Sequence, residues 1–133
     1  MEEHSSFQRA VAEIIGTGLL VFVGAGSVPA ILLLEGGTKA PFSGADLGFI
    51  SFAFGLIVVA MIYTIGKVSG CHINPAVTFA LAATKRIPWS DVPLYWTSQV
   101  AGGIAGAFAM WARSAPAPST SVTGSESSTS ITR

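Results

Sequence analysis

One stretch of the chain decides how the rest is interpreted. It is Ser69-Gly70-Cys71-His72-Ile73-Asn74-Pro75-Ala76-Val77-Thr78-Phe79-Ala80-Leu81-Ala82. Asn74 is a favoured N-cap residue, and Pro75 suits the first position of a helix, where its missing N–H costs nothing. Because proline also stops a preceding helix from continuing through it, residues 70–73 are expected to be extended. The stretch therefore predicts an extended strip of four residues followed by a short helix over 75–84.

The predicted helix 75–84 is only half as long as a membrane span. Its ten residues would rise about 15 Å, against a hydrocarbon core about 30 Å thick. An apolar half-span is a candidate re-entrant segment, whose irregular backbone survives at membrane depth only inside protein or beside a watery cavity. The alternative is a helix lying on the cytoplasmic surface, which Lys85 and Arg86 would suit. Re-entry is favoured, because 76–83 has almost no polar face.

Three long uncharged runs surround this stretch. They cover 14–34, 47–66 and 92–112, with lengths of 21, 20 and 21 residues. About 20 helical residues cross a bilayer core, and backbone groups in lipid must be satisfied within the segment, so three transmembrane helices are expected. A soluble helical core is a weaker alternative. So is a signal peptide over the first run, which is too long and lacks a clean small-residue cleavage site.

The composition also indicates a membrane protein. Charged residues make up 11% of the chain and hydrophobic residues 50%, whereas soluble domains carry about 25% charged residues. Seven basic residues balance seven acidic ones, so the chain lacks the basic surface of a nucleic-acid binder. A single cysteine excludes an intrachain disulfide framework. Membrane lipid, and no nucleic acid, is therefore the expected surrounding partner.

Basic residues and the last 20 residues indicate the orientation and the domain limits. The loop 67–91 holds three basic residues, whereas 35–46 holds Lys39 alone. The positive-inside rule then places this loop and the N-terminal segment 1–8 in the cytoplasm, and the end of the chain outside. The segment 114–133 is rich in Ser and Thr and too polar to offset its ordering entropy, so it is expected to be a disordered tail.

Small residues four apart occur in three pairs. The pairs are Gly102 with Gly106, Ser51 with Gly55, and Gly66 with Gly70. Such pairs let helix backbones approach closely in lipid, although glycine is common in membrane helices for other reasons. They favour tight packing between the predicted helices.

The motif and its surroundings resemble a known family. The stretch 69–78 is similar to the first Asn-Pro-Ala loop of the major intrinsic proteins, the aquaporins and glycerol facilitators. Residues 12–22 resemble the first helix of that family and 98–103 its third helix, in the right order and at the right spacing. The resemblance covers residues 9–113. It implies an all-α membrane protein with three transmembrane helices plus one re-entrant half-helix, which is one repeat of the six-helix aquaporin-like fold.

The resemblance implies that the motif lines a pore. The expected pore residues around the motif are Asn74, Pro75, Ala76, Gly70, Cys71 and His72. The Asn74 amide would donate to the solute and the carbonyls of 70–72 would accept from it, while Asn74 also serves as N-cap through its oxygen. The Cys71 thiol would lie beside the path. His72 fits a buried, hydrogen-bonded residue better than a metal ligand, because no Cys/His cluster completes a metal site.

Four further residues are expected to support the pore. Phe54 occupies a position that contributes to the outer filter of the family, where water-selective members tend to carry Phe; the alternative is a packing or lipid-facing ring. Val58, one turn later, would form an apolar pore wall. Glu13 resembles the family's carboxylate that braces loop N–H groups, although an acid complementing the helix dipole is the alternative. Gln99 resembles a similar polar brace between helices.

The function implied by the resemblance is a passive channel for water or small neutral solutes in the cell (plasma) membrane, and not an enzyme. No cofactor and no metal are expected, and full-length family members are expected to form homotetramers. Because the chain matches one repeat, we expect a truncated family member that does not conduct alone. The alternative is a non-conducting half-channel that co-assembles with full-length relatives as an interaction protein.

Overall fold

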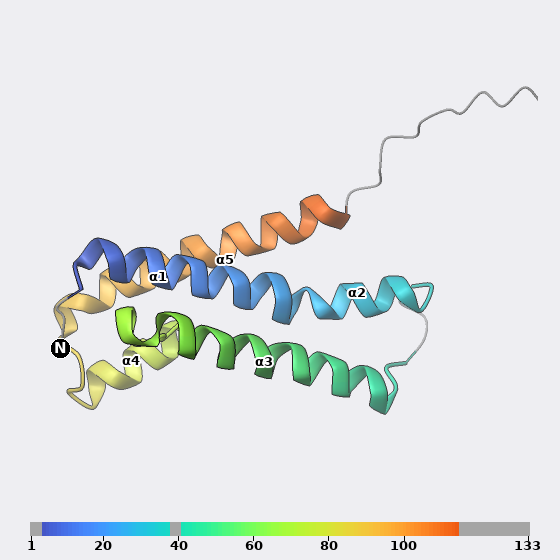
Figure 1. The fold of residues 1–133 in the computed structure, drawn as a ribbon, viewed down its shortest axis with the longest axis horizontal. Coiled ribbons are helices and arrows are strands. Elements are labelled where there is room, and N and C mark those ends of the chain that lie inside the picture. Colours follow the sequence, from blue (N-terminus) through green and yellow to red (C-terminus); the bar gives the residue numbers. More distant parts are fainter. Residues whose placement is uncertain (1–3, 38–40, 115–133) are drawn as a thin grey trace, which may run out of the picture.

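The computed structural model describes residues 4–37 and 41–114, and every regular element in these ranges is a helix (Figure 1). This confirms the predicted all-α fold class. Of the segment predicted as a disordered tail, Ser114 ends the last helix and 115–133 lies outside the described residues.

The first helical run covers Ser6–Leu34, so it begins well before the uncharged run 14–34. It consists of α1 (Ser6–Leu19), the π-helical segment η1 (Leu20–Ala25) and α2 (Ser27–Leu34). Ser5 and Gln8 form a capping box at its start, so residues 6–8 of the predicted N-terminal segment belong to α1. The wide π-turn comes just before Pro29, whose ring and missing N–H disrupt a regular α-helix.

The remaining elements follow the predicted order. They are α3 (Gly44–Ser69), α4 (Pro75–Ala83), the 3₁₀ turn η2 (Trp89–Asp91) and α5 (Val92–Ser114). Ser43 caps α3 by accepting from the Asp46 N–H, and Gly70 ends it in the left-handed conformation. With nine residues, α4 has about half the length of a membrane span.

The long helices lie side by side with α1 in the middle. α1 packs against both α3 and α5 (Figure 1). α4 packs against α5 at the end of the bundle where the chain begins, whereas α2 and the end of α5 lie at the opposite end (Figure 1). The half-length helix therefore sits at one end of the bundle and not along its middle.

Two helical runs in the described part of the chain are long and apolar enough to cross a membrane. They are Ser6–Leu34 and Gly44–Ser69. α5, predicted as the third span, has 23 residues and therefore sufficient length. It is not among the two, and it carries consecutive polar residues at 97–99.

Burial in this fold differs from that in a soluble domain. Among the described residues, eight polar or charged side chains are buried, against seven hydrophobic ones. Large hydrophobic side chains are exposed along every long helix, including Phe52 at 70%, Ile104 at 67% and Phe108 at 66%. So many exposed large apolar side chains are typical of a lipid-facing or protein-facing exterior. Polar side chains thus make up about half of the buried side chains, and apolar side chains cover much of the outside.

Glycines bring α1 and α5 into close contact. A Cβ atom added to Gly106 would overlap the carbonyl oxygen of Gly18, and one added to Gly102 would overlap that of Ile14. The close packing predicted for this pair is confirmed. Gly55 differs, because no atom lies within 4 Å of a Cβ built there.

We predict that Gly106→Ala destabilises the protein by about 1–3 kcal/mol, because the added methyl group forces the backbones of α1 and α5 apart. The free energy of unfolding in detergent micelles measures this. Gly55→Ala is the matched control, since it adds the same methyl group to a long helix in open space. Equal stabilities of the two variants would contradict the close contact.

Candidate functional site

Four residues, 70–73, connect α3 to Asn74, the N-cap of α4, and are called the strip from here on. Contrary to the expectation from the sequence, these residues are not extended. Gly70, Cys71 and Ile73 have positive φ angles of 86°, 51° and 41°. A β-branched residue is strained in this conformation, and such strain persists only where surrounding contacts determine the backbone. The expectation of an extended strip is therefore wrong, and a buried carboxylate supplies the contacts that bend it.

Glu13 of α1 is that carboxylate, and it is 0% exposed. Its Oε1 accepts hydrogen bonds from the His72 N–H at 2.9 Å and the Ser69 hydroxyl at 2.7 Å. Its Oε2 accepts from the Ile73 N–H at 2.7 Å and from Gln99 Nε2 at 2.8 Å. Four donors on two oxygens suit an ionised carboxylate, which only accepts. The convergence of two successive N–H groups on one anion accounts for the bent backbone.

A second set of hydrogen bonds ties α3, α4 and α5 together around the strip. Gln99 Nε2 also donates to Thr78 Oγ1 at 3.0 Å, and the same oxygen lies 3.0 Å from His72 Nδ1. The His72 ring stacks on Tyr95 with centroids 4.4 Å apart, and the Tyr95 hydroxyl donates to the Ser69 carbonyl at 2.6 Å. All five of these residues are buried. The network is therefore built from long-range polar contacts shielded from solvent.

The strip separates its donors from its acceptors. Its first two N–H groups donate to the Gly66 carbonyl at 3.0 Å and the Ser69 hydroxyl at 3.1 Å, and its last two donate to Glu13. Its four carbonyl oxygens accept no hydrogen bond from any residue in 4–37 or 41–114. Gly70 is exposed and Cys71 half-buried, so the first carbonyls belong to residues open to the surroundings. The strip can accept hydrogen bonds from a solute but has no N–H left to donate.

Asn74 presents the opposite chemistry at the start of α4. Its Oδ1 accepts from the Ala76 N–H at 2.8 Å, and its Nδ2 has no partner among the described residues. Asn74, Pro75 and Ala76 are all exposed. The Pro75 carbonyl accepts from the Trp96 indole at 3.1 Å, which ties the first turn of α4 to α5. An amide donor thus stands at the end of a row of carbonyl acceptors.

Phe54 and Val58 lie on α3 and make different contacts. The Phe54 ring packs against η1, where a Cβ built at Gly24 would lie 2.7 Å from it, and the residue is 38% exposed. Val58 packs against a buried cluster that includes Ile65 and the strip residue Ile73. The structure therefore links Val58 to the strip through packing and Phe54 to the first helical run.

Three residues of the network were missed in the sequence: Ser69, Thr78 and Tyr95. Two of them carry a helical-spacing signal. Thr78 follows Asn74 by four residues, and Tyr95 precedes Gln99 by four, so each shares a helix face with a predicted site residue. Ser69 carries no such signal, because its role depends on how α3 ends.

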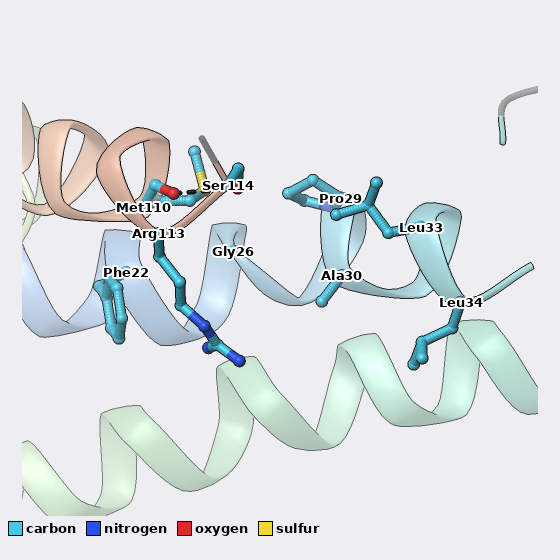
Figure 2. Close-up of a pocket in the computed structure, with 9 residues that line it drawn as sticks. All are labelled: Phe22, Gly26, Pro29, Ala30, Leu33, Leu34, Met110, Arg113 and Ser114. Carbon is cyan, nitrogen blue, oxygen red and sulfur yellow. Dashed lines mark hydrogen bonds between the residues drawn. The ribbon is translucent and has the colours of Figure 1, made fainter. Parts of the chain in front are cut away.

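A pocket of about 340 Å³ lies between α2 and the end of α5 (Figure 2), which lie at the far end of the bundle from α4 (Figure 1). Phe22, Pro29 and Leu33 give it apolar walls, and the Arg113 side chain extends from α5 toward α3 (Figure 2). None of the predicted site residues lines it. Within the described residues, no group of three His, Cys, Asp or Glu side chains could hold a metal ion.

These features define the class of protein: an all-α membrane protein in which a half-length helix follows a non-helical, hydrogen-bonded strip. The family model described as Major intrinsic protein matches residues 1–131, and the chain belongs to this family. The family indicated by the sequence motifs is thereby confirmed.

The chain is also similar to curated proteins named as aquaporins. The chain is 43% identical over 111 residues to Aquaporin NIP1-3 of Oryza sativa subsp. japonica. The matched region covers 84% of the chain and 36% of the relative. The chain is 40% identical over 111 residues to Aquaporin AqpM of Methanothermobacter marburgensis, covering 76% and 45%. It is 46% identical over 97 residues to Putative aquaporin NIP4-1 of Arabidopsis thaliana, covering 73% and 32%. The chain thus spans about a third to somewhat under half the length of these relatives.

We predict that Glu13→Gln lowers the free energy of unfolding by about 2 kcal/mol. The amide NH₂ group of glutamine cannot accept hydrogen bonds, so it would face donors that now bond to a carboxylate oxygen. Unfolding in detergent micelles measures the loss, and Cys71 in the loosened strip should react faster with a thiol reagent. Glu35→Gln, at an exposed position after α2, is the matched control and should change little. Unchanged stability of Glu13→Gln would contradict the role of the carboxylate in holding the strip.

Proposed function

We propose that the chain is half of a passive membrane channel for water or small neutral solutes. The observation that carries this proposal is the separation of acceptors and donors along the strip. The carbonyls of 70–73 have no partner in the described part of the chain, while the Asn74 Nδ2 group next to them remains able to donate. A neutral molecule with both hydroxyl hydrogens and oxygen lone pairs matches this arrangement.

In the proposed path, a water molecule donates its hydrogens to the strip carbonyls and then accepts from Asn74. The first turn of α4 adds partial positive charge at the same point, because unpaired N–H groups gather at a helix N-terminus. This charge disfavours cations. A water whose oxygen accepts from the amide is also held in an orientation that interrupts a continuous hydrogen-bonded, proton-conducting chain of waters. Each of these hydrogen bonds contributes little binding free energy, which suits rapid passage of the solute.

Side chains of α3 are proposed to shape the path. Phe54 is partly exposed and, by its position in the family, would narrow the outer filter and favour water over larger solutes. Val58 would contribute an apolar wall that offers no hydrogen bond to a solute. The path needs neither covalent chemistry nor a cofactor, so we assign the chain no enzymatic role.

The chain supplies one wall of this path, and we propose that a second half completes it. Asn74, Pro75 and Ala76 are exposed in the described part of the chain, so the face that carries the solute groups is open. Membrane lipid would cover the remaining apolar exterior. We further propose a plasma-membrane location with the N-terminus in the cytoplasm and the chain end outside, and homotetramers once both halves are present.

A second candidate function is a non-conducting half-channel that assembles with full-length relatives. Gly55 and Ser51 of α3 favour it, because they are exposed and a Cβ at Gly55 meets no atom within 4 Å. Such a face can receive another helix closely. Gly102 and Gly106 cannot serve this purpose, because they already pack against α1.

We predict that the chain alone leaves the water permeability of proteoliposomes at the level of empty vesicles. Together with the unmatched part of the Methanothermobacter marburgensis relative, it should raise permeability several-fold, because both walls are then present. Stopped-flow light scattering measures the shrinking rate. In the paired assembly Asn74→Ser should reduce this rate, since serine still caps α4 but lacks the amide donor.

The outcomes of that experiment separate the proposals. Water flux through the chain alone would contradict the half-channel. Absence of flux from two halves that co-purify would contradict the channel and favour the non-conducting alternative. Equal flux for Asn74→Ser and the parent pair would contradict the role of the amide.

We predict that an organic mercurial slows water flux through the paired assembly when the second half lacks cysteine. Cys71 is a free thiol in the strip and the single cysteine of the chain, so bulk added there obstructs the path. Cys71→Ser should keep the flux and lose the inhibition. Inhibition that persists in Cys71→Ser would place this residue away from the path.

A further inference from the structure

The turn after α4 forms a basic pocket at the end of the bundle where the chain begins. An open pocket of about 380 Å³ is lined by Ala82, Lys85, Arg86, Ile87, Pro88 and Trp89. We propose that this pocket binds the phosphate of an anionic phospholipid headgroup. The inference requires that α4 lies in a membrane, and it does not require that the chain conducts.

The two basic residues of the pocket lie in a hydrogen-bonded backbone turn. Lys85 has a left-handed φ of 60°, and its N–H donates to the Ala82 carbonyl at 3.0 Å. The Arg86 N–H donates to the Leu81 carbonyl at 2.8 Å, which closes a tight turn at the end of α4. The backbone of two successive basic residues is thereby held in a hydrogen-bonded turn.

No acidic group of the described residues neutralises these cations. Asp91 is the acid that follows them in the sequence, and its Oδ2 is bound by Arg9 Nη1 at 2.6 Å. This is the one ion pair among the described residues, so Lys85 and Arg86 have no acidic partner there. Within the described residues, the two positive charges of the pocket are therefore not balanced, and an external anion can balance them.

The surroundings favour a lipid over a soluble anion. Trp89 is 56% exposed and meets Phe79 edge-to-face with centroids 5.6 Å apart. Exposed aromatic rings beside basic residues are typical of the depth at which headgroups meet acyl chains. Phe79 of α4, which contacts Trp89, is also exposed and apolar, so an acyl chain can lie against these two rings below a bound phosphate.

A simpler role for the cations is to complement the dipole of α4. Thr84 already satisfies part of that need, because its hydroxyl donates to the Ala80 carbonyl at 2.8 Å and lies 3.2 Å from the Leu81 carbonyl. A dipole role also makes no distinction between lipids. Selectivity for anionic lipid therefore separates the two roles.

Native mass spectrometry of the full chain in detergent tests the proposal. The probes are phosphatidylglycerol and phosphatidylcholine with identical acyl chains. The first bound phosphatidylglycerol should have an affinity on the order of tenfold higher, given two cations at the surface. Lys85→Gln with Arg86→Gln should abolish this preference. Lys85→Arg with Arg86→Lys, which keeps both charges, should retain it.

The matched control is Arg86→Gln against Lys67→Gln. Lys67 is exposed in the last turn of α3 and does not line the pocket, so its loss removes the same charge from another site. Arg86→Gln alone should lower the preference and Lys67→Gln should not. Equal affinity of the parent chain for both lipids, or an unchanged preference in the double glutamine variant with unchanged helicity, would overturn the proposal. Displacement of phosphatidylglycerol by millimolar inorganic phosphate would overturn the assignment to lipid.

Discussion

The arrangement of the helices and the strip depends on one buried carboxylate. Glu13 lies on α1 and is fully buried. An unpartnered charge there would be very costly. Four donors from α3, the strip and α5 meet its two oxygens at 2.7–2.9 Å. The charge is tolerated only because these elements converge on it, and they converge because the charge attracts their donors. A single side chain thus joins the first helix to the site.

The chemistry of the strip follows from this attraction. Once Glu13 takes the N–H groups of His72 and Ile73, the backbone must bend into left-handed conformations to present them together. The carbonyls of the same residues are then left without partners in the described part of the chain. Asn74 adds a donor where the carbonyls end, because its oxygen is occupied by the N-cap. The interior bonds therefore determine which polar groups of the strip and of Asn74 remain without partners in the described part of the chain.

The rest of the molecule accommodates this polar interior in an apolar exterior. Gly102 and Gly106 let α5 approach α1 closely enough for Gln99 to reach both Glu13 and Thr78. Exposed aromatic and aliphatic side chains cover the long helices. Basic residues appear where α4 ends, at the same end of the bundle as the start of the chain (Figure 1). Polar contacts inside and apolar contacts outside are what a bilayer demands of a folded chain.

The sequence by itself determined the helical fold, the half-length of α4 and its N-cap. These depend on local rules: uncharged runs of span length, an Asn before a Pro, and the exclusion of proline from a helix interior. Only the tertiary structure decided that the strip is bent and not extended, and that Ser69, Thr78 and Tyr95 complete the network around it. Glu13 and Ile73 are 60 residues apart. A backbone conformation imposed by so distant a carboxylate leaves no mark in the local pattern of residues.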